Sequence, residues 1–139
     1  MTEIKIHELS VGDWVRYDRS TDAVQIMGIY VRNNQECVVM SDSYYPDGVI
    51  GFVDMLKPIP LTAEILEKNG FVEDVPKGEA YKLGINDDVW LFRNDGCWDF
   101  RIYYNFYSAG IILTQLRIKH THQLQHALRL AGVEKEIEI

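Results

Sequence analysis

The stretch that most constrains this chain is LKPIPLTAEILEKNGF, residues 56–71, because it separates two regions of different character. Its two prolines, Pro58 and Pro60, exclude both a regular helix and a central strand at its start. Thr62 is suited to cap a helix, and Gly70 is suited to end it. We therefore predict a short helix here, of about two turns, with one set of β-strands before it and a second set after it.

The region before this stretch alternates β-branched and apolar segments with clusters of turn residues, which is typical of short strands joined by turns. The expected strands cover residues 13–17, 24–31, 36–40 and 49–53. Several short strands of this kind favour a small barrel, and the segment VGDWV resembles the entry to SH3-like barrels. We therefore predict an SH3-like small β-barrel over residues 1–60, a fold that does not define a ligand.

Residues 61–139 predict an α+β unit, so the fold class expected for the whole chain is α+β. The expected elements are a helix over 62–69, an antiparallel β-meander over 80–119, a helix over 121–131 and a tail strand over 135–139. Thr121 is suited to cap the second helix, and Gly132 is suited to end it. We expect the regions 1–60 and 61–139 to pack as one unit.

The meander contains the strongest hairpin signal of the chain, the pair Asp95 and Gly96. The strand that follows is expected over residues 97–107. Side chains alternate between the two faces of a strand, which puts Phe100 on the core face and Tyr103 on the opposite face. The sequence therefore predicts one buried face and one mostly solvated face for this sheet.

Three motifs carry a resemblance to known sequences: VGDWVRY near the start, PIPLTAEILEKNGF in the middle and HQLQ near the end. Together they resemble an uncharacterised family of small proteins that is frequent in gut anaerobes and in their prophages and mobile elements. The chain differs from the family after HQLQ, where it has HALRLAG and the family is more aromatic. The resemblance implies a fold and a phage-related context, and it implies no catalytic residue.

The net charge of −7 argues against a nucleic-acid binder, because phosphate binding relies on clustered basic residues. No apolar run approaches the about 20 residues of a membrane span, and the N-terminus lacks the pattern of a signal peptide. The sequence also lacks a phosphate-binding loop and a dinucleotide fingerprint. We therefore expect a cytoplasmic protein with no membrane contact and no cofactor.

The candidate metal ligands are His120, His122 and His126. The second and third lie four residues apart on the predicted helix, a spacing that can direct two imidazoles at one metal ion. Residue 123 is Gln rather than Glu, so the general base of the H-E-x-x-H pattern is missing. A metal-binding protein or hydrolase is one alternative, and ordinary surface histidines on an amphipathic helix are the simpler interpretation.

The candidate partner-binding residues are Tyr44 and Tyr45, in the loop SDSYYPDG, and Tyr103 in the meander. Aromatic side chains of this kind are enriched at protein interfaces. The simpler interpretation is that one tyrosine packs under the loop while the Asp-Gly pair forms the turn.

From these observations we predict a non-catalytic cytosolic interaction module whose partner is another protein or a second copy of the chain. The sequence offers no support for an enzyme. A nucleic-acid-associated phage protein is a further alternative, which would need a local basic patch drawn from Arg16, Arg19 and Arg32.

Overall fold

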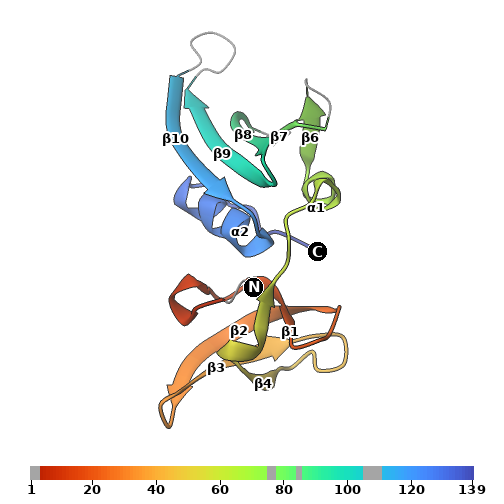
Figure 1. Cartoon of the computed structure of the whole chain (residues 1–139), viewed down its shortest axis with the longest axis vertical. Helices are drawn as coiled ribbons and strands as arrows, with labels where there is room; N and C mark the ends of the chain where they lie inside the picture. The colour runs from red at the N-terminus through yellow and green to blue at the C-terminus, as the bar shows by residue number, and fades with distance from the viewer. Residues whose placement is uncertain (1–3, 75–77, 84–85, 105–110) are drawn as a thin grey trace. The chain divides into compact units, whose positions relative to one another are not determined.

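The computed structural model describes residues 4–74, 78–83, 86–104 and 111–139. The chain divides into two compact units, Met1–Ile59 together with Ile139, and Pro60–Glu138 (Figure 1). Each unit contains one antiparallel five-stranded sheet, so the predicted α+β class is confirmed. Packing of the two regions as one unit stays a prediction. Within the described part of the chain, no helix is long and apolar enough to cross a membrane.

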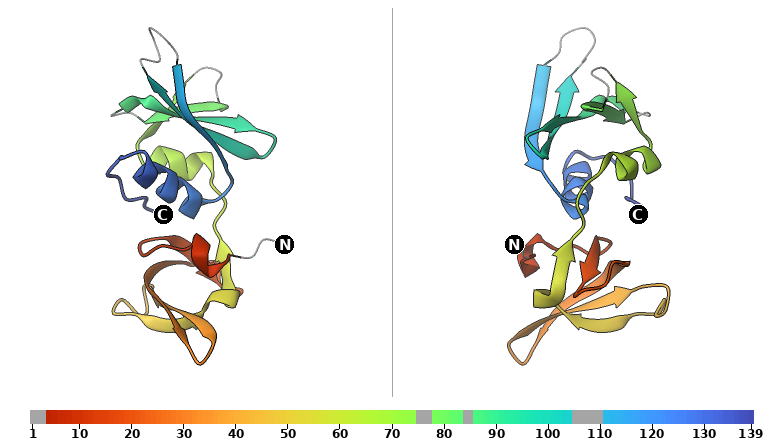
Figure 2. Two further views of the ribbon diagram at one scale, coloured as in Figure 1. Left: turned by 90° about the vertical axis from the view of Figure 1, so that its left-hand side faces the viewer. Right: turned by 45° about the vertical axis from the view of Figure 1, so that its right-hand side comes forward.

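In the first unit, the part of the chain that the structure describes forms two short 3-10 helices and five strands. They are η1 (Ile6–Glu8), β1 (Trp14–Tyr17), β2 (Ala23–Arg32), β3 (Gln35–Ser41), β4 (Val49–Phe52), η2 (Val53–Met55) and β5 (Leu56–Pro58). The β2–β3 turn consists of Asn33 and Asn34, which both have positive φ angles, of 52° and 61°. Asparagine tolerates this conformation, which the tight two-residue hairpin turn requires. The ribbon in Figure 2 shows the strong bend of the long β2–β3 hairpin.

The strand order of the first sheet is β4-β3-β2-β1-β5, so β4 and β5 are its two edges. The predicted SH3-like barrel is not confirmed, because the sheet is not closed. One side chain reaches across the open side, since the Phe52 backbone N–H of β4 donates to the Tyr17 hydroxyl of β1 at 3.2 Å. The inner face of the sheet holds the core, which includes Val15, Val24, Ile26, Val38, Met40 and Leu56.

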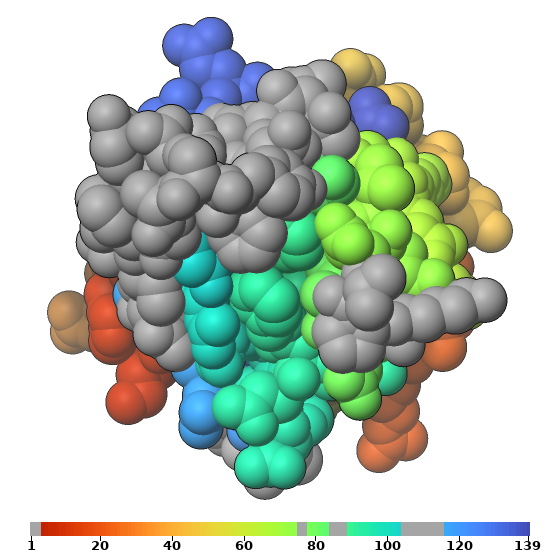
Figure 3. Space-filling model, turned by 90° about the horizontal axis from the view of Figure 1, so that it is seen from above, coloured from red at the N-terminus to blue at the C-terminus, as the bar shows by residue number. Residues whose placement is uncertain are grey.

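The described residues of the second unit form two helices and five strands. They are α1 (Ala63–Lys68), β6 (Phe71–Asp74), β7 (Ala80–Leu83), β8 (Asn86–Asn94), β9 (Cys97–Tyr104), β10 (Ile111–Ile118) and α2 (Thr121–Leu130). Their sheet has the order β10-β9-β8-β7-β6. The space-filling view shows the green atoms of β6 and β7 beside the teal atoms of β8 and β9 (Figure 3). Parts of the predicted meander and of the strand over 97–107 lie outside the described residues, at 84–85 and 105–110.

The local signals of the sequence explain most of these boundaries. The Thr62 side chain caps α1 by accepting from the Ile65 backbone N–H at 3.3 Å, as predicted. Asp95 and Gly96 form the β8–β9 turn with φ angles of 48° and 75°, which confirms the hairpin. The cap predicted at Thr121 is wrong, because His120 is the N-cap residue of α2. The Gln123 side chain closes this end by accepting from the His120 backbone N–H at 3.0 Å.

Both helices pack on one face of the second sheet. The buried side chains of this core include Leu66 from α1, Leu124 and Leu128 from α2, and Leu91, Trp98 and Phe100 from the strands. The opposite face carries a second, smaller core in which Ala80, Trp90 and Tyr103 are buried. The prediction of one mostly solvated face is therefore too simple, because three strands contribute apolar side chains to it.

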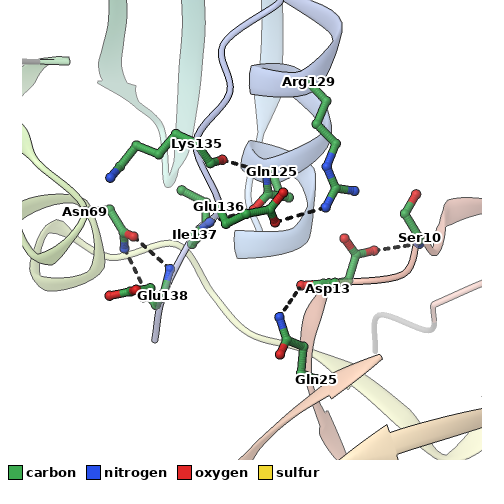
Figure 4. A network of polar contacts seen from close by, with 11 residues as sticks. Ser10, Asp13, Gln25, Asn69, Gln125, Arg129, Lys135, Glu136, Ile137 and Glu138 are labelled. Carbon is green, nitrogen blue, oxygen red and sulfur yellow. Dashed lines mark hydrogen bonds and ion pairs between the residues drawn. The ribbon is translucent and has the colours of Figure 1, made fainter. Parts of the chain in front are cut away.

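The C-terminal segment is held by side-chain amides instead of by strand pairing (Figure 4). The Asn69 side chain donates to the Glu138 carbonyl at 2.7 Å and accepts from the Glu138 N–H at 2.8 Å. The Gln125 side chain donates to the Lys135 carbonyl at 2.9 Å and accepts from the Ile137 N–H at 2.6 Å. The tail strand predicted over 135–139 is wrong, since the two amides supply the hydrogen-bond partners that a neighbouring strand would supply.

Candidate functional site

The loop between β3 and β4 presents two adjacent aromatic side chains on a hydrogen-bonded backbone. Tyr44 and Tyr45 are 81% and 57% exposed. One carboxylate oxygen of Asp42 accepts from the Tyr44 N–H at 2.9 Å and from the Tyr45 N–H at 2.6 Å. The Tyr45 carbonyl then accepts from the Gly48 N–H at 3.1 Å. These bonds order the backbone of the loop, while the tyrosine rings remain accessible to solvent.

A third tyrosine lies close to this loop because a glycine leaves room for its ring. A Cβ atom at Gly51 of β4 would lie 2.7 Å from Cε2 of Tyr17 and 2.5 Å from Cε of Met40. No real side chain fits so close to other heavy atoms. Gly51 therefore allows the Tyr17 ring to pack directly against β4, where its hydroxyl accepts from the Phe52 N–H.

These three tyrosines line a pocket of about 280 Å³, which we call the tyrosine pocket. Its walls come from the β1–β2 connection, the β3–β4 loop and the ends of the strands between them. The lining residues are Tyr17, Ser20, Asp22, Val24, Met40, Asp42, Tyr44, Tyr45, Val49 and Ile50. Two of these residues, Asp22 and Asp42, are acidic and none is basic. The pocket therefore combines aromatic surface with negative charge.

Exposed apolar side chains continue from the pocket onto the outer face of the same sheet. Ile50 and Phe52 lie two residues apart on β4 and are both exposed, and they therefore share one face. Met27 of β2 is also exposed, and a Cβ atom at Gly48 would lie 3.8 Å from its sulfur. The apolar rim formed by Met27, Ile50 and Phe52 extends the surface that a partner could contact.

Other hollows of the described surface offer less chemistry. One, of about 560 Å³, lies at the β2–β3 turn and is lined mainly by polar side chains of the hairpin tip. A second, of about 480 Å³, lies at the end of α2 and mixes Arg129 and Lys135 with Glu134 and Glu136. Volume alone does not identify a site, and neither hollow joins aromatic surface to charge of one sign.

Tyr103, the third predicted partner-binding residue, is only 7% exposed. Its ring meets that of Phe92 edge to face, with 6.5 Å between the ring centres. Its hydroxyl accepts from the Arg101 guanidinium at 3.2 Å. Tyr103 is thus a packing residue of the second unit in this structure and offers little surface to a partner.

The three candidate histidines lie together at the start of α2. The rings of His120 and His122 are nearly parallel, with 5.9 Å between their centres, and those of His122 and His126 are nearly perpendicular at 5.8 Å. His122 is only 3% exposed. Within the described residues, no group of three or more His, Cys, Asp or Glu side chains is arranged to hold a metal ion. The predicted metal site gains no support from this arrangement.

Sequence reasoning identified Tyr44 and Tyr45 and missed the other walls of the pocket. Tyr17, Asp22 and Asp42 come from different segments, and no local motif links them. One signal was available, because an aspartate two residues before a tyrosine in a turn-rich loop favours a side-chain to backbone turn.

The comparisons with known proteins leave the pocket as the main guide to function, and the family resemblance noted above stays a prediction. We found no protein-family model, no curated protein and no solved structure that matches this chain.

Proposed function

We propose that this chain is a non-catalytic protein-interaction module and that the tyrosine pocket is its binding site. The observation that carries the proposal is the exposure of Tyr44 and Tyr45 on a loop whose backbone is fixed by Asp42. Exposed tyrosines on an ordered loop offer a large contact area and lose little conformational entropy when a partner binds. The apolar rim of Met27, Ile50 and Phe52 would enlarge the contact.

The chemistry of the pocket favours binding over catalysis. Among the described lining residues, Ser20 is the only serine or threonine. Its Oγ accepts from the Asp22 N–H at 3.1 Å. A serine nucleophile needs an adjacent general base, usually a histidine. Among the residues placed by the structure, the pocket lining includes no histidine, cysteine or lysine.

The proposal extends to the fold and the location of the module. We propose that the first unit is related to SH3-like barrels, with support from β1, which pairs with both β2 and β5, and from the Tyr17 contact across the open side. We also propose a cytoplasmic location, since Cys37 and Cys97 are both free thiols. A nucleic-acid partner is disfavoured, because the ionisable side chains of the pocket are acidic.

A selection from a random peptide library tests this proposal. Wild-type protein and the double variant Tyr44→Ala/Tyr45→Ala are immobilised, and peptides that bind only the wild type are collected and sequenced. The matched control is Val31→Ala/Leu130→Ala, which removes two exposed apolar side chains that do not line the pocket. Thermal unfolding of all three proteins checks that the substitutions leave the fold intact.

We expect peptides whose binding is lost in the tyrosine variant and retained in the control variant. If every peptide that binds the wild type binds the two variants equally well, or if no peptide binds the wild type, the pocket is not a protein-binding site. Light scattering at several concentrations separates a foreign partner from a second copy, because a self-binding pocket would produce a dimer that the tyrosine variant loses.

A further inference from the structure

We infer that the tyrosine pocket binds a basic side chain, an arginine or a lysine, of its protein partner. The inference rests on the proposed function and adds the chemistry of the group that enters the pocket. It follows from three observations: how this chain uses its other aromatic rings, which charges line the pocket, and how large the pocket is.

The second unit pairs aromatic rings with basic side chains of the same chain. The Arg101 guanidinium lies 4.7 Å from the centre of the Phe92 ring. The Arg93 guanidinium lies 4.8 Å from the Trp98 ring, and Nζ of Lys82 lies 5.9 Å from the Trp90 ring. A cation is attracted to the negative face of an aromatic ring at distances of up to about 6 Å.

The tyrosine pocket has the same aromatic component, and none of its lining residues that the structure describes is basic. Within the described part of the chain, no lysine or arginine stacks on Tyr17, Tyr44 or Tyr45. Asp22 and Asp42 line the pocket together with these three tyrosines instead. Ring faces and carboxylates both attract cations, so the pocket favours a positively charged guest over a neutral one.

The size of the pocket fits a single long side chain. Its volume of about 280 Å³ lies just below the range of about 300–1,000 Å³ found for pockets that hold whole small molecules. Its lining offers apolar side chains, Val24, Met40 and Val49, as well as the two aspartates. Arginine and lysine combine an apolar stem with a cationic end.

The charge of the whole protein supports the same partner. The net charge of −7 attracts a basic partner over distances comparable to the Debye length, and added salt screens this attraction. A basic guest should therefore bind more weakly as the salt concentration rises, whereas a neutral guest held by apolar contact should not.

Two matched pairs of small probes test the inference on the full chain. The arginine probe, Nα-acetylarginine methylamide, is compared with its citrulline counterpart, which has nearly the same shape and no charge. The lysine probe is compared with its Nε-acetylated form in the same way. NMR titration follows the ring resonances of Tyr17, Tyr44 and Tyr45, because even weak binding shifts the signals of protons that lie near the guest.

Three single variants assign the binding to individual groups. Asp42→Asn keeps an oxygen that can accept from the Tyr44 and Tyr45 N–H groups and removes the charge, and we expect binding to weaken about 2- to 5-fold. Tyr44→Ala removes one ring face, and we expect a loss of about 2- to 30-fold. Asp47→Asn is the control, because it removes an equal charge from the same loop at a residue that does not line the pocket.

Binding of a charged probe that exceeds binding of its neutral counterpart, and that weakens in Asp42→Asn and Tyr44→Ala but not in Asp47→Asn, would support the inference. The inference would be overturned if charged and neutral probes bind equally, or if the probes shift other NMR signals but not those of the three tyrosine rings. The library selection keeps the two proposals apart: tyrosine-dependent peptides without arginine or lysine would refute this inference and leave the interaction module standing.

Discussion

The Asn69 amide should be among the most sensitive polar groups of the second unit. It is only 2% exposed. Its Nδ2 donates to the carbonyls of Ile65, at 2.8 Å, and Glu138, at 2.7 Å. Its Oδ1 accepts from the Glu138 N–H at 2.8 Å. Replacement by alanine therefore removes three hydrogen bonds in one step, two to the C-terminal segment and one within the end of α1.

The expected loss of stability depends on whether the three backbone groups that lose the Asn69 amide find other hydrogen-bond partners. The Ile65 carbonyl keeps a second donor, the Asn69 backbone N–H at 3.2 Å, so it is not left without a bond. The two Glu138 backbone groups belong to an exposed residue and can turn to water, which places each loss near the net value of about 1 kcal/mol. Together with the small void left by the amide, Asn69→Ala should lower the free energy of unfolding by about 2–4 kcal/mol.

Asn69→Asp should cost more at neutral pH, because the introduced carboxylate faces the Ile65 and Glu138 carbonyl oxygens and has no proton to donate. Burial and these oxygens raise the pKa of the introduced carboxyl above its ordinary value. A group with a raised pKa in the folded state binds its proton more strongly there, so the deficit is full above that pKa. It should shrink as the pH falls through that pKa toward the ordinary range of an aspartate.

Urea unfolding followed by tryptophan fluorescence measures the stability, and amide hydrogen exchange at Ile137 and Glu138 reports the C-terminal segment directly. Asn34→Asp is the control, because it makes the same chemical change at an exposed turn residue of the first unit. An Asn69→Ala protein that unfolds within about 0.5 kcal/mol of wild type, with unchanged protection of Glu138, would refute this account of the segment.

Three further predictions concern single side chains. Gly51→Ala should lower the free energy of unfolding by about 1–3 kcal/mol and weaken binding at the tyrosine pocket, because the new Cβ would lie within 2.7 Å of two neighbouring side chains. Gly28→Ala is the control, because the nearest neighbour of its new Cβ would lie at 3.6 Å. It should leave the urea midpoint and probe binding nearly unchanged. Burial, followed by the hydrogen bond to Glu73, raises the pKa of Tyr81 above 10.0. Its contribution to stability is therefore complete below pH 10 and lost as the pH rises through the raised pKa. The difference in unfolding free energy between wild type and Tyr81→Phe should shrink in urea titrations at alkaline pH. A difference that stays constant with pH would contradict the shift. Ile137→Ala should cost about 2–5 kcal/mol because it empties a buried position, whereas Leu130→Ala, at an exposed position, should stay within about 0.5 kcal/mol of wild type in the same assay.

The local parts of the fold could be predicted because their signals lie within a few residues of one another. The Thr62 cap of α1 and the Asp95-Gly96 turn each depend on a short segment, and both appear where the sequence places them. The C-terminal strand was predicted wrongly from the same kind of signal. Its alternating pattern is compatible with a strand. Its hydrogen-bond partners, however, are side chains as many as 69 positions away, and no local sequence pattern indicates them.

The candidate site, too, could be predicted from the sequence only where its signal is local. Tyr44 and Tyr45 are visible in the sequence because two adjacent aromatic residues occupy a loop rich in turn residues. Their relation to Tyr17 depends on Gly51, which is informative only when the strand opposite it is known. The exposure of Tyr103 was misjudged because alternation assigns a residue to one face of a sheet and does not show whether that face is itself covered.

The bonds between Asn69 and Glu138 also set the order in which the chain can complete its structure during synthesis. At about 5–20 residues per second, the ribosome adds the 69 residues between them in roughly 3–14 s. During that time α1 has been synthesised, whereas the segment that bonds to the Asn69 amide does not yet exist. Almost all residues of the first unit have been synthesised once Ile59 is added. This unit can therefore fold before the last few residues of the second unit have been synthesised.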